Sequence, residues 1–153
     1  DEVFVIEQTM KNFISSSFIN IVEEPEQNLF PTSQQKVINS LLEYNNTLDH
    51  NKLIITTHSP YIIGYMTLAV KAMELYKKAK KEEVRAQINE IVPQKSAISY
   101  DDLVIYELDE KDGSIHKLDT YKGIPSSKNY LNSELSEKNE LYAQLLDIED
   151  LCR

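Results

Sequence analysis

Glycine and proline are scarce in this chain, and their scarcity limits the folds that it can adopt. The 153 residues contain 3 glycines and 5 prolines. Turns depend on both residue types, because glycine supplies positive φ angles and proline presets φ near −65°. Their small number argues against a turn-rich all-β fold and against long disordered linkers. A chain of this length is expected to form one compact domain with its own core.

Cysteine and long apolar runs are also nearly absent. The single cysteine is Cys152, so no internal disulfide can form. No apolar run approaches 18 residues and no signal peptide is recognisable, which favours a cytoplasmic protein without a membrane partner. The chain opens with Asp1 and Glu2 rather than Met, and we therefore expect a piece of a longer protein.

Positive charge is in deficit. The chain has 16 Lys and Arg against 25 Asp and Glu, a formal net charge of −9. A general electrostatic grip on nucleic acid needs clustered Lys and Arg, so the composition disfavours it, although a basic patch on a partner domain stays open. The lysine-rich run 77–81 is the local exception, and a solvated helix face explains it better than a nucleic-acid contact.

Two short apolar runs rich in β-branched residues are the most informative feature that is present. FINIVEE (18–24) ends in Glu23 and Glu24, and LIITTH (53–58) ends in His58. Strands of a parallel sheet covered on both faces are continuous apolar runs, and functional residues gather at their carboxyl ends. We therefore expect two neighbouring strands that bring both glutamates and the imidazole to one sheet edge. Such a set can handle a metal ion, a water and a phosphate.

The rest of the chain alternates helices with these strands. Helices are expected over residues 2–16, 31–46, 60–92 and 132–150, the third with a break near 78–82. In the first of these segments, VFVI (3–6) alone could instead form a strand. Thr32 is placed to cap the second helix and Ser59 to cap the third, which Pro60 then opens. Asp112-Gly113 predicts the turn of a hairpin over 103–119. The order indicates an α/β fold with a parallel sheet, followed by an antiparallel β-hairpin and a C-terminal helix.

Each part of the expected site also has an ordinary structural explanation. Glutamates at a strand end are commonly just solvated, and a histidine after a strand commonly bonds a neighbouring carbonyl. Pro25 must turn the chain after the first strand, which would let one carboxylate reach a magnesium ion while the other polarises a water. Elsewhere, Asp109 and Asp112 have the character of loop acids, and His116 is isolated in the sequence.

The segments EEPEQNLFP (23–31) and TTHSP (56–60) resemble the Walker B/D-loop and switch-histidine segments of ABC-type ATPases. The subgroup they resemble is the bacterial AAA-labelled ATP-binding proteins related to the OLD and SMC lineages, whose usual pattern is EEPEAHLHP followed by THSP. The likeness runs over most of the chain. It implies a P-loop NTPase-like half-domain with Walker B at 18–24, the D-loop at 27–30 and the switch at 53–60.

The resemblance also implies roles for single residues, with ATP and Mg²⁺ as cofactors. Glu23 would be the magnesium-organising acid, Glu24 the catalytic glutamate that orients water, and His58 the sensor of the γ-phosphate. Gln27 and Asn28 would belong to the nucleotide-contacting D-loop that meets the opposite subunit. The chain departs from the subgroup pattern at Asn28 and Phe30, where histidines are usual.

A glycine-rich phosphate loop is missing. No G-x-x-x-x-G-K-[ST] sequence occurs, and glycines at 64, 113 and 123 cannot build one. The signature motif is missing as well. We therefore expect the C-terminal part of an ATPase head that is inactive alone. Its expected partners are the N-terminal half of the same domain, a second copy in a homodimer around ATP, and an effector or nuclease.

Two other functions stay open at this point. One is a non-enzymatic interaction module, derived from an ATPase, that holds a partner through the arm at 77–92 and the C-terminal helix. The other is a stand-alone metal-dependent hydrolase that uses Glu23, Glu24, Glu26 and His58.

Overall fold

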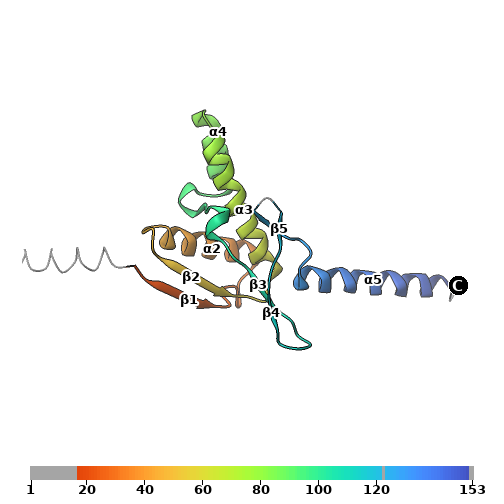
Figure 1. Cartoon of the computed structure of the whole chain (residues 1–153). Helices are drawn as coiled ribbons and strands as arrows, with labels where there is room; N and C mark the ends of the chain where they lie inside the picture. The colour runs from red at the N-terminus through yellow and green to blue at the C-terminus, as the bar shows by residue number, and fades with distance from the viewer. Residues whose placement is uncertain (1–16, 122, 152–153) are drawn as a thin grey trace, which may run out of the picture.

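A parallel pair of strands organises the fold in this computed structural model, which describes residues 17–121 and 123–151. β1 (Ile19–Glu23) and β2 (Lys52–Thr56) pair in parallel, and α2 (Pro31–Asn45) lies between them in the chain, beside the sheet in Figure 1. Ile21 pairs with Ile54 and Glu23 with Thr56. The two strands are parallel and pair along their whole length, so their carboxyl ends are aligned. The segments that follow the two strands therefore leave the sheet at the same edge. The helix expected over 2–16 falls outside the described residues.

The sheet is covered on one face. Leu53 and Ile55 pack against a core supplied mainly by α2 and α3 (Pro60–Lys78), with Ile38 and Ile62 among its buried members. Ile19, Ile21 and Ile54 alternate with the covered positions and are exposed, Ile21 by 65%. The expectation of a sheet covered on both faces is therefore wrong for the described residues. Apolar runs put branched side chains on both faces of the strands, but both helices contribute to a core on one face only.

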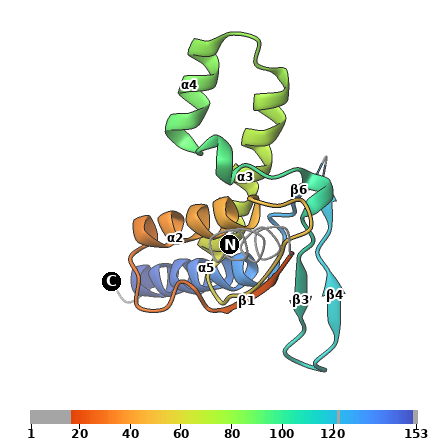
Figure 2. The ribbon, with the colours of Figure 1, turned by 90° about the vertical axis from the view of Figure 1, so that its left-hand side faces the viewer.

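α3 and α4 (Glu82–Ile91) form an arm that rises from the body (Figures 1 and 2). The arm breaks at residues 79–81, where Ala79 is extended, inside the lysine-rich run. Tyr76 is buried between the two helices of the arm, and its hydroxyl donates to the Val92 carbonyl at 2.8 Å. Two 3-10 turns, Gln94–Ser96 and Tyr100–Asp102, return the chain to the body. The arm is thus a helical hairpin closed by its own small core.

Some of the charged side chains near this break form ion pairs with one another within α3. Glu74 forms ion pairs with Lys71 and Lys78, and their hydrogen bonds lower its pKa to about 2. Lys77 donates to the Ser99 hydroxyl at 3.5 Å. The lysines of the run are exposed, which is consistent with its interpretation as a solvated face.

The C-terminal third consists of two small antiparallel hairpins and a helix. β3 (Tyr106–Leu108) pairs with β4 (Ile115–Lys117), and β5 (Thr120–Tyr121) with β6 (Ile124–Pro125). The sequence predicted only the first of these hairpins. α5 (Tyr130–Leu151) then extends away from the body (Figure 1). No described helix is long and apolar enough to cross a membrane.

Two helix starts differ from the predicted caps. α2 begins at Pro31 with Phe30 as its N-cap, so Thr32 lies inside the first turn and caps nothing. The proline fixes a helical φ and starts the helix before the threonine. Ser59 does precede Pro60 at the start of α3, but its hydroxyl donates to the Gln34 side-chain oxygen at 3.1 Å instead of capping.

Candidate functional site

Glu24 and His58 meet at the carboxyl edge of the β1–β2 pair. Glu24 Oε1 lies 3.4 Å from His58 Nε2, although the residues are 34 positions apart in the sequence. The Glu24 backbone amide donates to the Thr56 carbonyl at 2.9 Å and extends the strand ladder by one bond. The His58 side chain is 86% exposed and the Glu24 side chain 33%. The pair therefore faces solvent, where a ligand can reach it.

The turn after β1 has an unusual backbone. Glu24 has φ +44° and Asn28 has φ +58°, both in the left-handed region. Asparagine tolerates this region, whereas a glutamate there is uncommon, at a cost of about 1–2 kcal/mol. Backbone strain of this kind clusters at functional sites. The left-handed conformation of Glu24 ends the strand at Glu23. The Glu24 carboxylate then contacts His58, and its Oε2 accepts from the Gln27 side-chain amide at 2.5 Å.

Glu26 ties this turn to the segment after β2. Its Oε1 accepts from the Thr57 hydroxyl at 2.6 Å and from the His58 backbone amide at 2.9 Å. The Thr57 hydroxyl oxygen in turn accepts from the Ser59 amide at 2.9 Å. Sequence reasoning gave Glu26 a place only in the metal-hydrolase alternative. The sequence signal for this role of Glu26 was an acid in the turn after the first strand. This turn lies at the same edge of the sheet as the polar residues that follow the second strand.

The other predicted residues lie beside this cluster without joining its contacts. Glu23 ends β1 on the exposed face that also carries Ile19 and Ile21. Asn28 is exposed at the far end of the turn, and Phe30 is 81% exposed. Among the described residues, the structure thus joins Glu24, Gln27 and His58 and leaves Glu23 and Asn28 outside their hydrogen bonds.

A helix begins after each half of the site. His58 immediately precedes α3, a 19-residue helix, and the turn that holds Glu24 leads into α2. Helix N-termini carry partial positive charge and attract phosphate groups. The described residues contain no group of three or more His, Cys, Asp or Glu side chains arranged to hold a metal ion. A stand-alone metal site therefore has no support here, whereas a cation shared with a phosphate ligand needs only one or two carboxylates.

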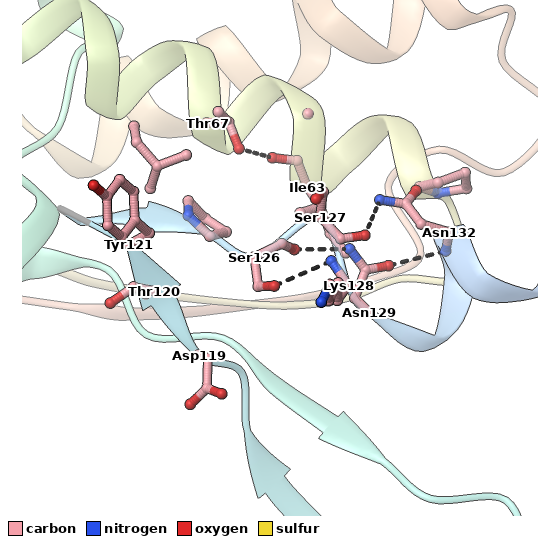
Figure 3. A pocket seen from close by; sticks show the side chains of 14 residues that line it. Ile63, Thr67, Asp119, Thr120, Tyr121, Ser126, Ser127, Lys128, Asn129 and Asn132 are labelled. Atoms are coloured by element: carbon pink, nitrogen blue, oxygen red, sulfur yellow. Dashed lines mark hydrogen bonds between the residues drawn. The ribbon is translucent and has the colours of Figure 1, made fainter.

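An open hollow of about 680 Å³ lies elsewhere, between α3 and the loop that leads into α5. Figure 3 shows several of its polar groups bonded to one another, for example the Ser127 carbonyl, which accepts from the Asn132 side-chain amide at 2.9 Å. Pro60, Gly64 and Thr67 line its other side. None of the residues predicted for catalysis lines it, so the hollow is separate from the sheet-edge site.

Comparison with known proteins gives one positive result. Residues 3–63 match the family model of an AAA ATPase domain. The match spans β1, α2, β2 and the start of α3, and so contains every residue of the sheet-edge site. Neither the search of curated proteins nor that of solved structures returned a match. The family match supports an ATPase-related function, and ATP with Mg²⁺ as the ligands that such domains generally use.

Proposed function

We propose that this chain supplies the acidic and histidine side of an ATP-hydrolysing site of the ABC type. The observation that carries the proposal is the contact between Glu24 and His58, which joins the ends of two parallel strands inside the matched segment. In this proposal residues 18–24 are the Walker B strand and residues 53–60 the switch segment. The parallel pair is then part of a P-loop NTPase-like sheet.

The side chains fit the ligands that this function requires. Carboxylates are hard oxygen donors, and magnesium in nucleotide sites is held by one or two of them together with the phosphates. Glu23, exposed at the end of β1, is the residue proposed to hold it. Bound magnesium would neutralise charge on the phosphates. Glu24 orients a water for attack, Gln27 steadies the Glu24 carboxylate, and the exposed His58 imidazole donates to a γ-phosphate oxygen.

The remaining parts of the site must come from outside these 153 residues, since no lysine-bearing glycine loop can be built from them. We propose that another segment supplies the phosphate loop and that two heads close around ATP. The D-loop at Gln27–Phe30 would then contact the second copy. The 81% exposure of Phe30, next to the site, suits such a contact. An effector or nuclease partner would use the closure.

Replacing Glu24 with Gln tests the proposal directly. In the protein that joins this chain to its phosphate loop, Glu24→Gln should slow ATP hydrolysis by about 10²- to 10⁴-fold, the usual contribution of a positioned proton acceptor. ATP should stay bound, because the amide keeps the shape of the side chain. Measurements are steady-state phosphate release and retention of labelled ATP on a filter.

Glu43→Gln is the matched control, since Glu43 forms an ion pair with Lys95 on the surface. It should hydrolyse ATP at the unaltered rate. Hydrolysis by Glu24→Gln at the rate of this control would remove Glu24 from its assigned role, and the proposed site with it.

A second candidate function is an interaction module, and α5 is the observation that favours it. Tyr142, Leu145 and Ile148 are each more than half exposed on this helix, and Leu141 and Leu146 lie beside them. Apolar residues spaced in this way form one face of a helix and suit a partner surface. The absence of both ATP hydrolysis and a thermal shift with Mg-ATP in the protein that joins this chain to its phosphate loop would favour this candidate over the ATPase.

A further inference from the structure

One carboxylate oxygen connects the two strand ends that form the site. Glu26 Oε1 accepts two hydrogen bonds, from the Thr57 hydroxyl at 2.6 Å and from the His58 amide at 2.9 Å. These bonds span 31 and 32 positions in the sequence. Bonds to an ionised acceptor are shorter and about twice as strong as those between neutral groups. Glu26 therefore fixes the backbone that carries His58 to the turn that carries Glu24.

A second bridge runs parallel to the first. The side chain of Gln34, which is buried, donates to the Leu29 carbonyl at 3.0 Å and accepts from the Ser59 hydroxyl at 3.1 Å. The Ser59 amide donates to the Thr57 hydroxyl oxygen, so the two bridges are continuous. The turn after β1 and the segment after β2 are consequently held together at both ends by side-chain hydrogen bonds.

The remaining oxygen of Glu26 shows that this arrangement has a cost. Oε2 is buried and has no hydrogen-bond partner among the described residues. An unsatisfied buried polar atom typically costs about 1–3 kcal/mol, and more when it is charged. The carboxylate at this position is therefore poorly explained by stability alone, since it leaves one of its oxygens unpaired.

His58 depends on such a fixed backbone. Its imidazole is 86% exposed and contacts the Glu24 carboxylate at 3.4 Å, so packing does little to hold it. The place of an exposed ring follows from the position of its own backbone. We propose that Glu26 is a positioning residue that fixes His58 opposite Glu24 through the Thr57 hydroxyl and the His58 amide. This inference rests on the proposed function and deepens it.

Variants of Thr57 test the inference without touching either site residue. Thr57→Val keeps the shape of the side chain but removes the hydroxyl, whereas Thr57→Ser keeps the hydroxyl. In the protein with its phosphate loop, Thr57→Val and Glu26→Ala should each lower kcat on the order of tenfold to a hundredfold, the scale expected for a misplaced group. The KM for ATP should change less than about twofold, because interactions made only in the transition state affect kcat. Thr57→Ser should restore most of kcat.

The contact itself is measured on the 153-residue chain by NMR. The His58 amide proton should shift upfield and exchange faster in Glu26→Ala, and stay in place in the control Glu43→Ala. An unmoved His58 amide overturns the inference. So does a normal kcat in Thr57→Val and Glu26→Ala while Glu24→Gln abolishes hydrolysis. If Glu24→Gln itself hydrolyses ATP normally, the proposed function fails and the inference falls with it.

Discussion

The sheet edge and the β3–β4 hairpin both place acids near a histidine, yet they use them differently. At the sheet edge, Glu26 reaches His58 across 32 positions of sequence. In the hairpin, His116 Nε2 lies 2.7 Å from the Ser114 hydroxyl, and Asp112 accepts from the Ser114 amide at 2.8 Å. Every one of these hairpin bonds spans two positions. The hairpin acids shape a turn, as loop acids commonly do.

This difference shows that acids and a histidine close together in the sequence do not by themselves form a functional site. The Asp112 carboxylate accepts hydrogen bonds from Ser114, two positions away in the sequence. These bonds lower the pKa of the Asp112 carboxyl below its ordinary value. Glu24 and His58, by contrast, meet only because β1 and β2 pair in parallel and in even register. A site of this kind needs the tertiary fold, whereas the hairpin turn needs only its own few residues.

The largest predicted difference between the sheet region and the hairpin is in how much each contributes to the free energy of unfolding. Ile38 is fully buried in the core beneath the sheet, whereas Ile115 in β4 is 65% exposed. Ile38→Ala should lower the free energy of unfolding by about 2–5 kcal/mol, through lost transfer energy and a cavity. Ile115→Ala should change it by no more than about 0.5 kcal/mol. Urea denaturation followed by circular dichroism measures both, and equal losses would contradict the separation of the two regions.

A smaller effect concerns pH. A carboxyl whose pKa is lowered on folding stabilises the folded state above its unfolded pKa, here 3.8, and the contribution is lost as the pH falls through the lower folded value. The hairpin turn should therefore loosen in acid below about pH 3.8, because protonated Asp112 accepts the Ser114 amide more weakly. Amide exchange at Gly113 and Ser114 reports this loosening. Asp112→Asn should remove the pH dependence, and its persistence in this variant would assign it to another acid.

Much of the sheet edge could be predicted from the sequence. Two β-branched runs ending in Glu23-Glu24 and in His58 predicted neighbouring strand ends, and the strands do pair in parallel with these ends at one edge. The mixed α/β character and the first hairpin followed from the same kind of pattern. The catalytic roles themselves stay predictions, because the geometry shows proximity and not chemistry.

Other features could not be predicted, for identifiable reasons. An apolar run does not say which faces of its strand will be covered, so the exposure of Ile21 was missed. Thr32 was expected to cap its helix, but Pro31 starts the helix one residue earlier. The part played by Glu26 depends on a contact 31 positions away, which no local pattern encodes. The two-residue strands β5 and β6 are too short to leave a periodic signal.

The most direct measurement is a double-variant cycle on ATP hydrolysis in the protein with its phosphate loop, using Glu24→Gln, His58→Ala and both together. If the two side chains form one site, the combined loss should be smaller than the product of the single losses, with a coupling of about 0.5–3 kcal/mol. The hairpin pair Asp112→Asn and His116→Ala should leave hydrolysis unaltered, alone or combined. Single losses that multiply independently for Glu24 and His58, or no loss at all, would contradict the account.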